Sequence, residues 1–314
     1  MYQPCALSPG TSLACGFRSV QAWIIANPAA GTAGAKLDPL RELVAGRTDV
    51  QLHETAGPGD ARRLAAEAAA AGVELVMAAG GDGTINEVIQ GLAATPSRPR
   101  LGLLPLGTGN DLARTLGISA DPAEALAIAM GEGERALDLF RAEMNGEIRY
   151  GINMAAGGFS GQVDEVLTEE MKATWGPLAY VRSAMSVLPD LTGYDTAIAW
   201  DDGELERSEV FNIIIANGRT CAGGMRVAPD ADPADGLLDV VVVRYGSLLD
   251  LARIGAKLLT GDYLESDGVS LRRVRRLRVA SRPGMWFNVD GELIGNTPVT
   301  FEVMPGALRV AAPA

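Results

Sequence analysis

The chain has 314 residues, of which 47% are hydrophobic and 5% aromatic, and 39 acidic against 27 basic residues give a formal net charge of −12. This length accommodates two domains with their own cores, and the acidic excess argues against non-specific binding to nucleic acid. Because no run of about 18 apolar residues occurs, the sequence predicts no membrane-spanning helix. These properties are typical of a soluble cytoplasmic α/β enzyme.

Residues 1–20 contain Pro, Ser and Gly without any periodicity. The segment lacks the basic start and the long apolar stretch of a signal peptide, so we expect a disordered extension. Cys5, Cys15 and Cys221 have neither metal-ligand spacing nor the pattern of a disulfide framework, which suits a reducing cytoplasm.

Strands and helices alternate from residue 21 to about residue 138. Short apolar runs predict four strands, at Trp23–Ala26, Val50–Glu54, Leu75–Ala79 and Leu101–Pro105. The stretches between them are rich in Ala and Leu, as in Ala61–Ala71, and favour helices. This alternation predicts a parallel, Rossmann-like sheet with right-handed crossovers.

The turn after the third predicted strand reads Gly-Gly-Asp-Gly-Thr-Ile-Asn, residues 80–86. Glycines at a strand-to-helix turn let backbone N–H groups face an anion, and the helix dipole adds to the attraction. Asp82 could then reach a ribose hydroxyl, a phosphate-bound metal or the reacting group. The alternative is an ordinary tight turn, but the length of the motif and its context favour a phosphate site.

Polar residues also follow the other three predicted strands. Asn27-Pro28 follows the first strand, Thr55 the second, and Gly107-Thr108-Gly109-Asn110-Asp111 the fourth. Asn110 or Asp111 can cap a helix that begins there, and Thr55 is either an ATP contact or a helix cap. Because parallel strands end at one rim, where open α/β sheets bind ligands, we expect these loops to meet.

The pattern changes near residues 136–139 to short strands separated by turns, which predicts an antiparallel β domain. Helical segments interrupt it near Val163–Leu188 and Ser247–Leu259, and the chain ends in strand-like runs at Val299–Val303 and Leu308–Ala311. The strands of this domain are expected at Glu147–Ile152, Thr196–Trp200, Val210–Ala216, Leu238–Arg244, Arg276–Ala280 and Trp286–Asp290.

Two acidic segments of the second half are candidates for chemistry. Asp290-Gly291-Glu292 follows an apolar run, and on spacing alone it is an ordinary hairpin turn. The loop from Asp230 to Asp239 brings several carboxylates together in a Pro- and Gly-bent segment. It is either a site for a hard cation or a solvated acidic loop.

The motifs Asn27-Pro28, Gly80–Asn86 and Pro105–Asp111, in this order, resemble the diacylglycerol kinase catalytic domain. That superfamily includes sphingosine and ceramide kinases and the soluble bacterial lipid kinases. The resemblance runs from about residue 21 to the C-terminus. It implies a nucleotide-binding α/β domain over residues 21–138 and an antiparallel, β-sandwich-like lipid-substrate domain over residues 139–298. Residues 299–314 would return to the first domain, with the active site in the interdomain cleft.

The resemblance also implies roles for individual residues. The Asp-Gly-Glu segment would include the base that accepts the lipid hydroxyl proton; we favour Glu292, with Asp290 as its partner and Asp82 across the cleft. A structural Mg²⁺ would be held by Asp232, Asp235 and the Leu237 carbonyl, and the catalytic Mg²⁺ would arrive with ATP. The chain has no P-loop motif, so the nucleotide would be bound by Asn27, Thr55, Gly80, Gly81, Asp82, Gly83, Thr84, Asn86 and Thr108.

The expected activity is therefore transfer of the γ-phosphoryl group of ATP to a lipid hydroxyl, with diacylglycerol the leading acceptor and phosphatidic acid the product. Such an enzyme would contact the inner face of the membrane transiently, and its relatives suggest a homodimer. The alternatives are an NAD kinase, which shares the Gly-Gly-Asp-Gly-Thr turn, and a non-catalytic nucleotide- or lipid-binding relative. The basic run Arg272–Arg278 is either a solvated strand face or a contact with anionic headgroups.

Overall fold

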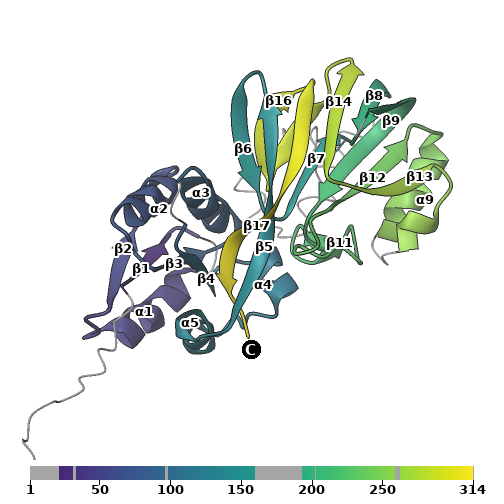
Figure 1. The fold of residues 1–314 in the computed structure, drawn as a ribbon. Coiled ribbons are helices and arrows are strands. Elements are labelled where there is room, and N and C mark those ends of the chain that lie inside the picture. Colours follow the sequence, from purple (N-terminus) through teal and green to yellow (C-terminus); the bar gives the residue numbers. More distant parts are fainter. Residues whose placement is uncertain are drawn as a thin grey trace, which may run out of the picture.

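The computed structural model of the chain describes residues 21–30, 33–95, 98–159, 193–201, 203–258 and 262–313. Figure 1 shows an α/β domain joined to a larger β-rich domain. The expected disordered extension of residues 1–20 and the expected helix near Val163–Leu188 lie outside the described residues.

The α/β domain is built on a four-stranded parallel sheet in the order β4-β3-β1-β2. Helices α2 and α3 cover one face, and α1 and α5 cover the other (Figure 1). The elements are β1 Ala22–Ala26, α1 Ala33–Val44, β2 Val50–Glu54, α2 Asp60–Ala70, β3 Leu75–Gly80, α3 Asp82–Ala93, β4 Arg100–Pro105, α4 Asp111–Leu116 and α5 Pro122–Met130.

Burial on both faces explains the continuous apolar runs of the central strands. All six residues of β3 are buried, and five of the six in β4, as expected for parallel strands covered by helices on both sides. The predicted parallel sheet is confirmed, and each of its four strands is found within one residue of its predicted bounds.

The β-rich domain is antiparallel, with its main core between two layers of strands. Its central aromatic group is Phe140, Phe287 and Phe301, with ring centroids 5.3 and 6.3 Å apart. Its elements are β5 Glu134–Met144, β6 Glu147–Gly151, β7 Met154–Gly158, β8 Tyr194–Trp200, β9 Glu204–Ala216, β10 Thr220–Cys221, β11 Met225–Arg226, β12 Leu238–Arg244, α9 Leu248–Leu258, the 3-10 helix η2 Asp262–Glu265, β13 Val269–Val274, β14 Arg276–Arg282, β15 Trp286–Val289, β16 Glu292–Asn296 and β17 Val299–Ala311.

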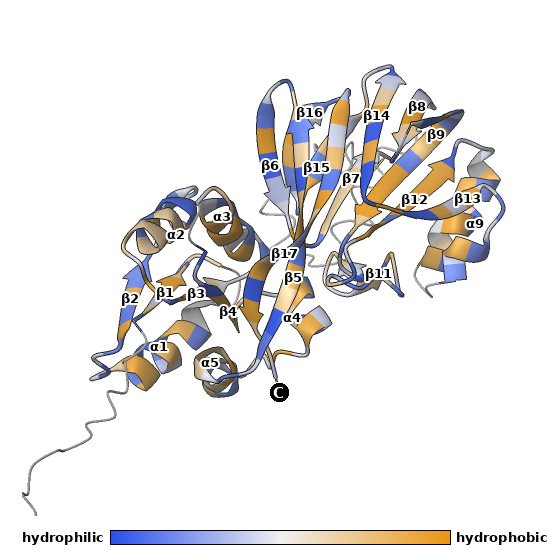
Figure 2. Ribbon diagram, in the orientation of Figure 1, coloured by the Kyte–Doolittle hydropathy of each residue, from blue (hydrophilic) through white to orange (hydrophobic). Residues whose placement is uncertain are grey.

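Hydropathy follows this layering. In Figure 2, β12 is largely hydrophobic, whereas β14 carries several hydrophilic positions. Six of the seven residues in β12 are buried, because α9 and η2 cover its second face, where Leu251, Ile254 and Tyr263 pack. In β14, Leu277 and Val279 enter the core and Arg276 and Arg278 face solvent, which is the alternation of a strand covered on one side.

Strand β17 connects the two domains. It pairs with β5 from Thr300 opposite Glu143 to Ala311 opposite Glu134, with one irregularity between Met304 and Leu308. At one end it also pairs with β14, and at the other Val310 pairs with Leu101 of β4. The two runs expected at Val299–Val303 and Leu308–Ala311 are therefore a single strand that returns to the first sheet.

Helices α2 and α3 pack closely because α3 has a glycine where they meet. A Cβ on Gly91 would collide with the carbonyl oxygen of Arg62 and lie 2.8 Å from the Cβ of Ala65. By contrast, a Cβ on Gly255, in the exposed face of α9, would have no atom within 4 Å.

Replacing Gly91 by alanine is expected to destabilise the protein by about 1–3 kcal/mol, because the extra methyl overpacks a helix interface. Gly255→Ala is the matched control and is expected to stabilise by up to about 1 kcal/mol, the gain in helix propensity. Urea unfolding of both variants measures the two changes. A stabilised Gly91→Ala protein would show that α2 and α3 are not in close backbone contact.

Candidate active site

The N-terminus of α3 lies at the rim where the parallel strands end, and no side chain caps it. Its N-cap residue is Gly81, directly after β3, so its first N–H groups can bind an anion. The N-terminus of α2 differs, because the Glu87 carboxylate accepts from Gly59 N at 2.9 Å and Ala61 N at 3.1 Å. Of these two helices, α3 is the one available to phosphate.

The two glycine loops after β3 and β4 are in backbone contact. A Cβ on Gly107 would collide with the Cα of Gly81, and a Cβ on Gly109 would lie 2.5 Å from Oδ2 of Asp82. Only glycine permits this approach at Gly107 and Gly109. The loops predicted to meet at the rim therefore do so.

Asp82 points at the start of α4. Its Oδ1 accepts from Asp111 N at 2.8 Å, and the amides of Asn110 and Leu112 also stabilise its charge. Burial, followed by the negative charge of Asp111, nevertheless raises the pKa of Asp82 above the usual aspartate value. Asn110 is the N-cap residue of α4, one of the two predicted, but its side chain makes no capping hydrogen bond. Asp82 supplies the acceptor instead, and Asn110 Nδ2 donates to Gly107 O at 2.8 Å.

The other residues predicted to contact the nucleotide differ in how far their side chains are buried. Asn27 donates from Nδ2 to Thr84 Oγ1 at 3.3 Å, and this bond joins the loop after β1 to the glycine turn after β3. Thr84 is 4% exposed, and Thr108 lies at the surface. Thr55 follows β2 and donates its N–H to Ala26 O at 2.8 Å. It is not a helix cap, because α2 begins five residues later with Gly59 as its N-cap.

Asn86 lies one turn into α3, buried against the second domain. Its Oδ1 accepts from Gln90 Nε2 at 3.0 Å. Gln90 then pairs with the backbone of Tyr150 in β6, where it accepts from Tyr150 N at 3.1 Å and donates to Tyr150 O. Asn86 thus takes part in holding the helix against the β-rich domain.

Asp290 is held by backbone amides. Its Oδ1 accepts from Asn153 N at 3.1 Å and Met154 N at 2.8 Å, and its Oδ2 from Ile152 N at 2.9 Å. Burial outweighs these bonds and raises the pKa of Asp290 to about 6, with a smaller contribution from the charge of Asp82. The Asp290 carboxylate therefore fixes the connection between β6 and β7.

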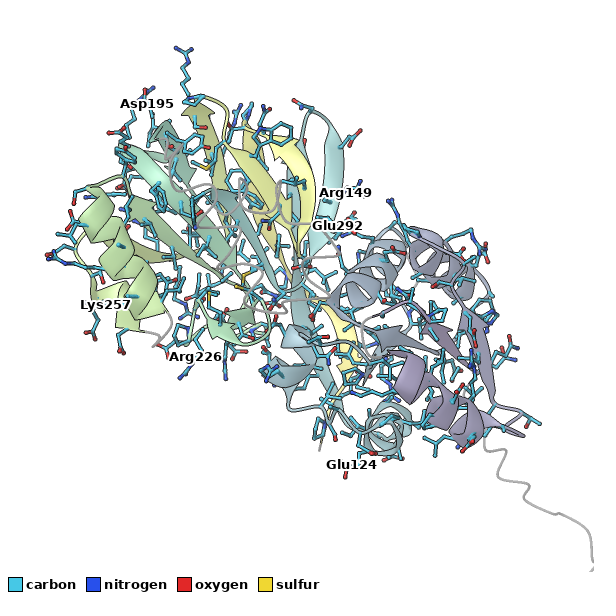
Figure 3. All side chains as sticks on the ribbon, turned by 180° about the vertical axis from the view of Figure 1, so that it is seen from behind. Glu124, Arg149, Asp195, Arg226, Lys257 and Glu292 are labelled. Carbon is cyan, nitrogen blue, oxygen red and sulfur yellow. The ribbon has the colours of Figure 1, made fainter. Side chains whose placement is uncertain are left out.

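The Asp-Gly-Glu segment is a tight hairpin turn as well as a candidate catalytic motif. Asp290 and Gly291 have φ of 47° and 85°, the positive values of a two-residue hairpin turn. The Glu292 side chain that follows is exposed, and no hydrogen bond or ion pair holds it within the described part of the chain. Figure 3 shows Glu292 on the side of the β-rich domain that faces the α/β domain, whereas Glu124 lies at the lower edge of the α/β domain.

The sequence did not reveal how these loops are joined between the two domains. The Asp111 side chain, 5% exposed, accepts from Thr220 Oγ1 at 2.9 Å and from Gly223 N at 2.9 Å. Thr220 O in turn accepts from Asn153 Nδ2 at 2.9 Å. Hairpin β10–β11 is too short to give a sequence pattern, so the only sequence signal was the presence of Asp111 in the second loop.

The predicted metal loop does not bring its carboxylates together. Asp232 faces Arg135 at 3.9 Å, and Asp235 is paired with Arg273, which also lies 3.6 Å from Asp239. Asp232 also accepts a hydrogen bond from Ala234 N, and Asp235 accepts one from Leu237 N. Among the described residues, no group of three or more His, Cys, Asp or Glu side chains is arranged to hold a metal ion.

The basic run is divided between two environments. Arg272 stacks over Trp200 at 4.9 Å from the ring centroid and pairs with Glu204 at 3.1 Å. Arg276 and Arg278 instead line a shallow pocket of about 280 Å³ with Glu143 and Thr300. Together with the pairing of Arg273, this shows that part of the run is neutralised by acidic neighbours.

Two family models match the chain. The diacylglycerol kinase catalytic domain matches residues 21–142, and the YegS C-terminal NAD kinase beta sandwich-like domain matches residues 153–312. A diacylglycerol kinase of Bacillus subtilis is 32% identical over 93% of this chain and 96% of its own length. A Pseudomonas aeruginosa protein named "Probable lipid kinase YegS-like" is 38% identical over 82% of each chain. The crystal structure of a diacylglycerol kinase from Bacillus anthracis superposes with a TM-score of 0.77 at 26% identity, covering 94% of this chain and 97% of that one.

Replacing Asp290 by asparagine is expected to remove a pH-dependent part of the stability. The folded pKa of about 6 lies above the unfolded value of 3.8, so this carboxyl contributes stability that is complete below about pH 4 and is lost as the pH rises through about 6. Urea unfolding from pH 4 to pH 7 measures it. The difference in free energy of unfolding between wild type and Asp290→Asn should shrink across this window; a constant difference would contradict the burial of the carboxylate.

Proposed function

The chain belongs to the diacylglycerol kinase catalytic-domain family and is a lipid kinase, and from that membership we propose that it transfers the γ-phosphoryl group of Mg²⁺-bound ATP to the free hydroxyl of diacylglycerol. The supporting observation is that hydrogen bonds through Asp111, Thr220 and Asn153 link Asp82 of the α/β domain to Asp290 in the Asp-Gly-Glu turn of the β-rich domain. A nucleotide on one loop and a lipid on the other would meet between them.

Glu292 is the proposed base. Its carboxylate is exposed toward the other domain and free of partners among the described residues, whereas Asp290 uses both oxygens to accept backbone amides. Glu292 would accept the hydroxyl proton as the lipid oxygen attacks the γ-phosphorus. The new O–P bond forms as the bond to the β–γ bridging oxygen breaks, and ADP leaves. Asp290 then positions the turn and does not take the proton.

The phosphates would bind at the N-terminus of α3, against the amides of the Gly80–Thr84 turn. No lysine of a P-loop is present to neutralise them. Arg114 is a nearby cation, with Nη2 donating to Gly109 O at 3.0 Å at the edge of the second glycine loop. Because Asp82, Asp111 and Asp290 make the region between the two domains acidic, a divalent cation bound to ATP would supply the missing positive charge.

Diacylglycerol is the proposed acceptor because relatives that align over nearly the whole chain carry the name diacylglycerol kinase. Because such an acceptor lies in a membrane, we propose transient contact with the inner membrane face. No helix in the described residues is long and apolar enough to span a bilayer. A homodimer is a further proposal from the family.

A kinase assay with γ-labelled ATP, Mg²⁺ and mixed micelles of several lipids, with NAD as a parallel acceptor, tests the assignment. Label in phosphatidic acid supports diacylglycerol as the acceptor, and label in another lipid or in NADP would show that the acceptor is that lipid or NAD instead.

The Glu292→Gln variant is expected to lose about 10²- to 10⁴-fold in kcat, the contribution of a general base, while its affinity for ATP is unchanged. Glu124→Gln, an exposed glutamate at the lower edge of the α/β domain in Figure 3, is the control and should keep full activity. Steady-state kinetics and ATP titration calorimetry measure both. Full transfer by Glu292→Gln would move the role of base to another group.

The acidic loop is proposed to bind a structural Mg²⁺ through Asp232, Asp235 and the Leu237 carbonyl. These oxygen donors suit the ion, but binding would have to displace Arg273 from Asp235. Added Mg²⁺, without nucleotide, is therefore expected to raise the Tm of the wild type and not that of Asp235→Asn. The exposed Asp195→Asn is the control. If Mg²⁺ leaves the wild-type Tm unchanged, the loop is held by its arginines alone.

A further inference from the structure

Hairpin β10–β11 contacts both domains, at Asp111 in α4 and at Asn153 between β6 and β7. On one side, Thr220 Oγ1 and Gly223 N donate to the two oxygens of Asp111, at 2.9 Å each. On the other side, Thr220 O accepts from Asn153 Nδ2 at 2.9 Å. One residue of a two-residue strand therefore stands between the α/β domain and the strand connection that Asp290 holds.

The hydrogen bonds continue from Thr220 to both site carboxylates. Asp111 N donates to Asp82 Oδ1 at 2.8 Å, and Asn153 N donates to Asp290 Oδ1 at 3.1 Å. The result is an unbroken path from Asp82 through Asp111, Thr220 and Asn153 to Asp290. The Thr220 hydroxyl is the link in this path that joins side chain to side chain across the two domains.

The local backbone is shaped for this contact. Ala222, Gly223 and Gly224 all have positive φ, of 50°, 84° and 113°, which turns the Gly223 N–H toward Asp111. The side chain of Arg114 lies 3.6 Å from a Cβ position on Gly224, so the hairpin tip is also seated against α4. Because Asp111 is buried, its charge requires these donors.

We propose that Thr220 is a positioning residue for phosphoryl transfer, which sets the distance between the Asp82 loop and the Asp-Gly-Glu turn when the two domains meet. This inference rests on the proposed function, because it assigns the two loops to the nucleotide and to the lipid. Thr220 itself touches neither reactant. Its loss should therefore change the rate of transfer more than the binding of ATP.

The test is the pair Thr220→Val and Thr220→Ser. Valine keeps the shape and removes the hydroxyl donor, and it is expected to lower kcat about 10- to 100-fold, the range for one hydrogen bond to a charged group, with the Kd for ATP unchanged. Serine keeps the donor and is expected to restore kcat to within about threefold. Thr300→Val, on the outer face of β17, is the control and should match the wild type.

Asp111→Asn provides a second, independent arm, because it keeps the backbone amide that donates to Asp82. If both residues act through one bond, the double variant Thr220→Val with Asp111→Asn should be no slower than the slower single variant. The inference would be overturned if the double variant lost kcat by the product of the two single losses, or if Thr220→Val kept the wild-type kcat. Wild-type protein that transfers no phosphate to any lipid would instead refute the proposed function.

Discussion

The relative position of the two domains depends on one antiparallel ladder, that of β5 with β17. These strands pair over nine residue positions, and β17 extends from the β-rich domain into the parallel sheet beside β4. Asp138 in β5 reinforces the junction, because its buried carboxylate accepts from Gly236 N at 2.6 Å and Gly306 N at 2.7 Å. A strand ladder, even with the irregularity between Met304 and Leu308, is stiffer than a linker, so the carboxyl rim of the first sheet is held facing the second domain.

Buried carboxylates that accept backbone amides recur where the two domains meet. Asp82, Asp111, Asp138 and Asp290 each accept at least one, and none of them has an arginine or lysine partner within ion-pairing distance among the described residues. Amides order these side chains without cancelling their charge. Burial is the main cause that raises the pKa values of Asp82 and Asp290, and a neighbouring carboxylate adds to it, Asp111 for Asp82 and Asp82 for Asp290. This negative charge is the reason why a divalent cation is proposed to accompany the nucleotide.

The sequence predicted the parallel sheet well, because apolar runs bounded by Gly, Pro and Asn mark strands that are buried on both faces. It missed Met154–Gly158, whose Ala and Gly residues have little strand preference; β7 exists because it is paired on both sides, by β9 and β15. It also divided β17 in two, because Pro305 and Gly306 interrupt the pattern where the strand bends between sheets.

The sequence by itself singled out the loops that are proposed to carry the chemistry. Composition pointed to the glycine turns after β3 and β4, whereas the Asp-Gly-Glu turn, on spacing an ordinary hairpin turn, was singled out by the family resemblance. Only the tertiary structure decided which donors surround each acid. Asp290 accepts backbone amides, Glu292 has no hydrogen-bond or ion-pair partner among the described residues, and Asp111 joins Thr220 across 109 residues of chain. A carboxylate's role depends on which donors surround it, and folding brings those donors from segments whose separation no local pattern records.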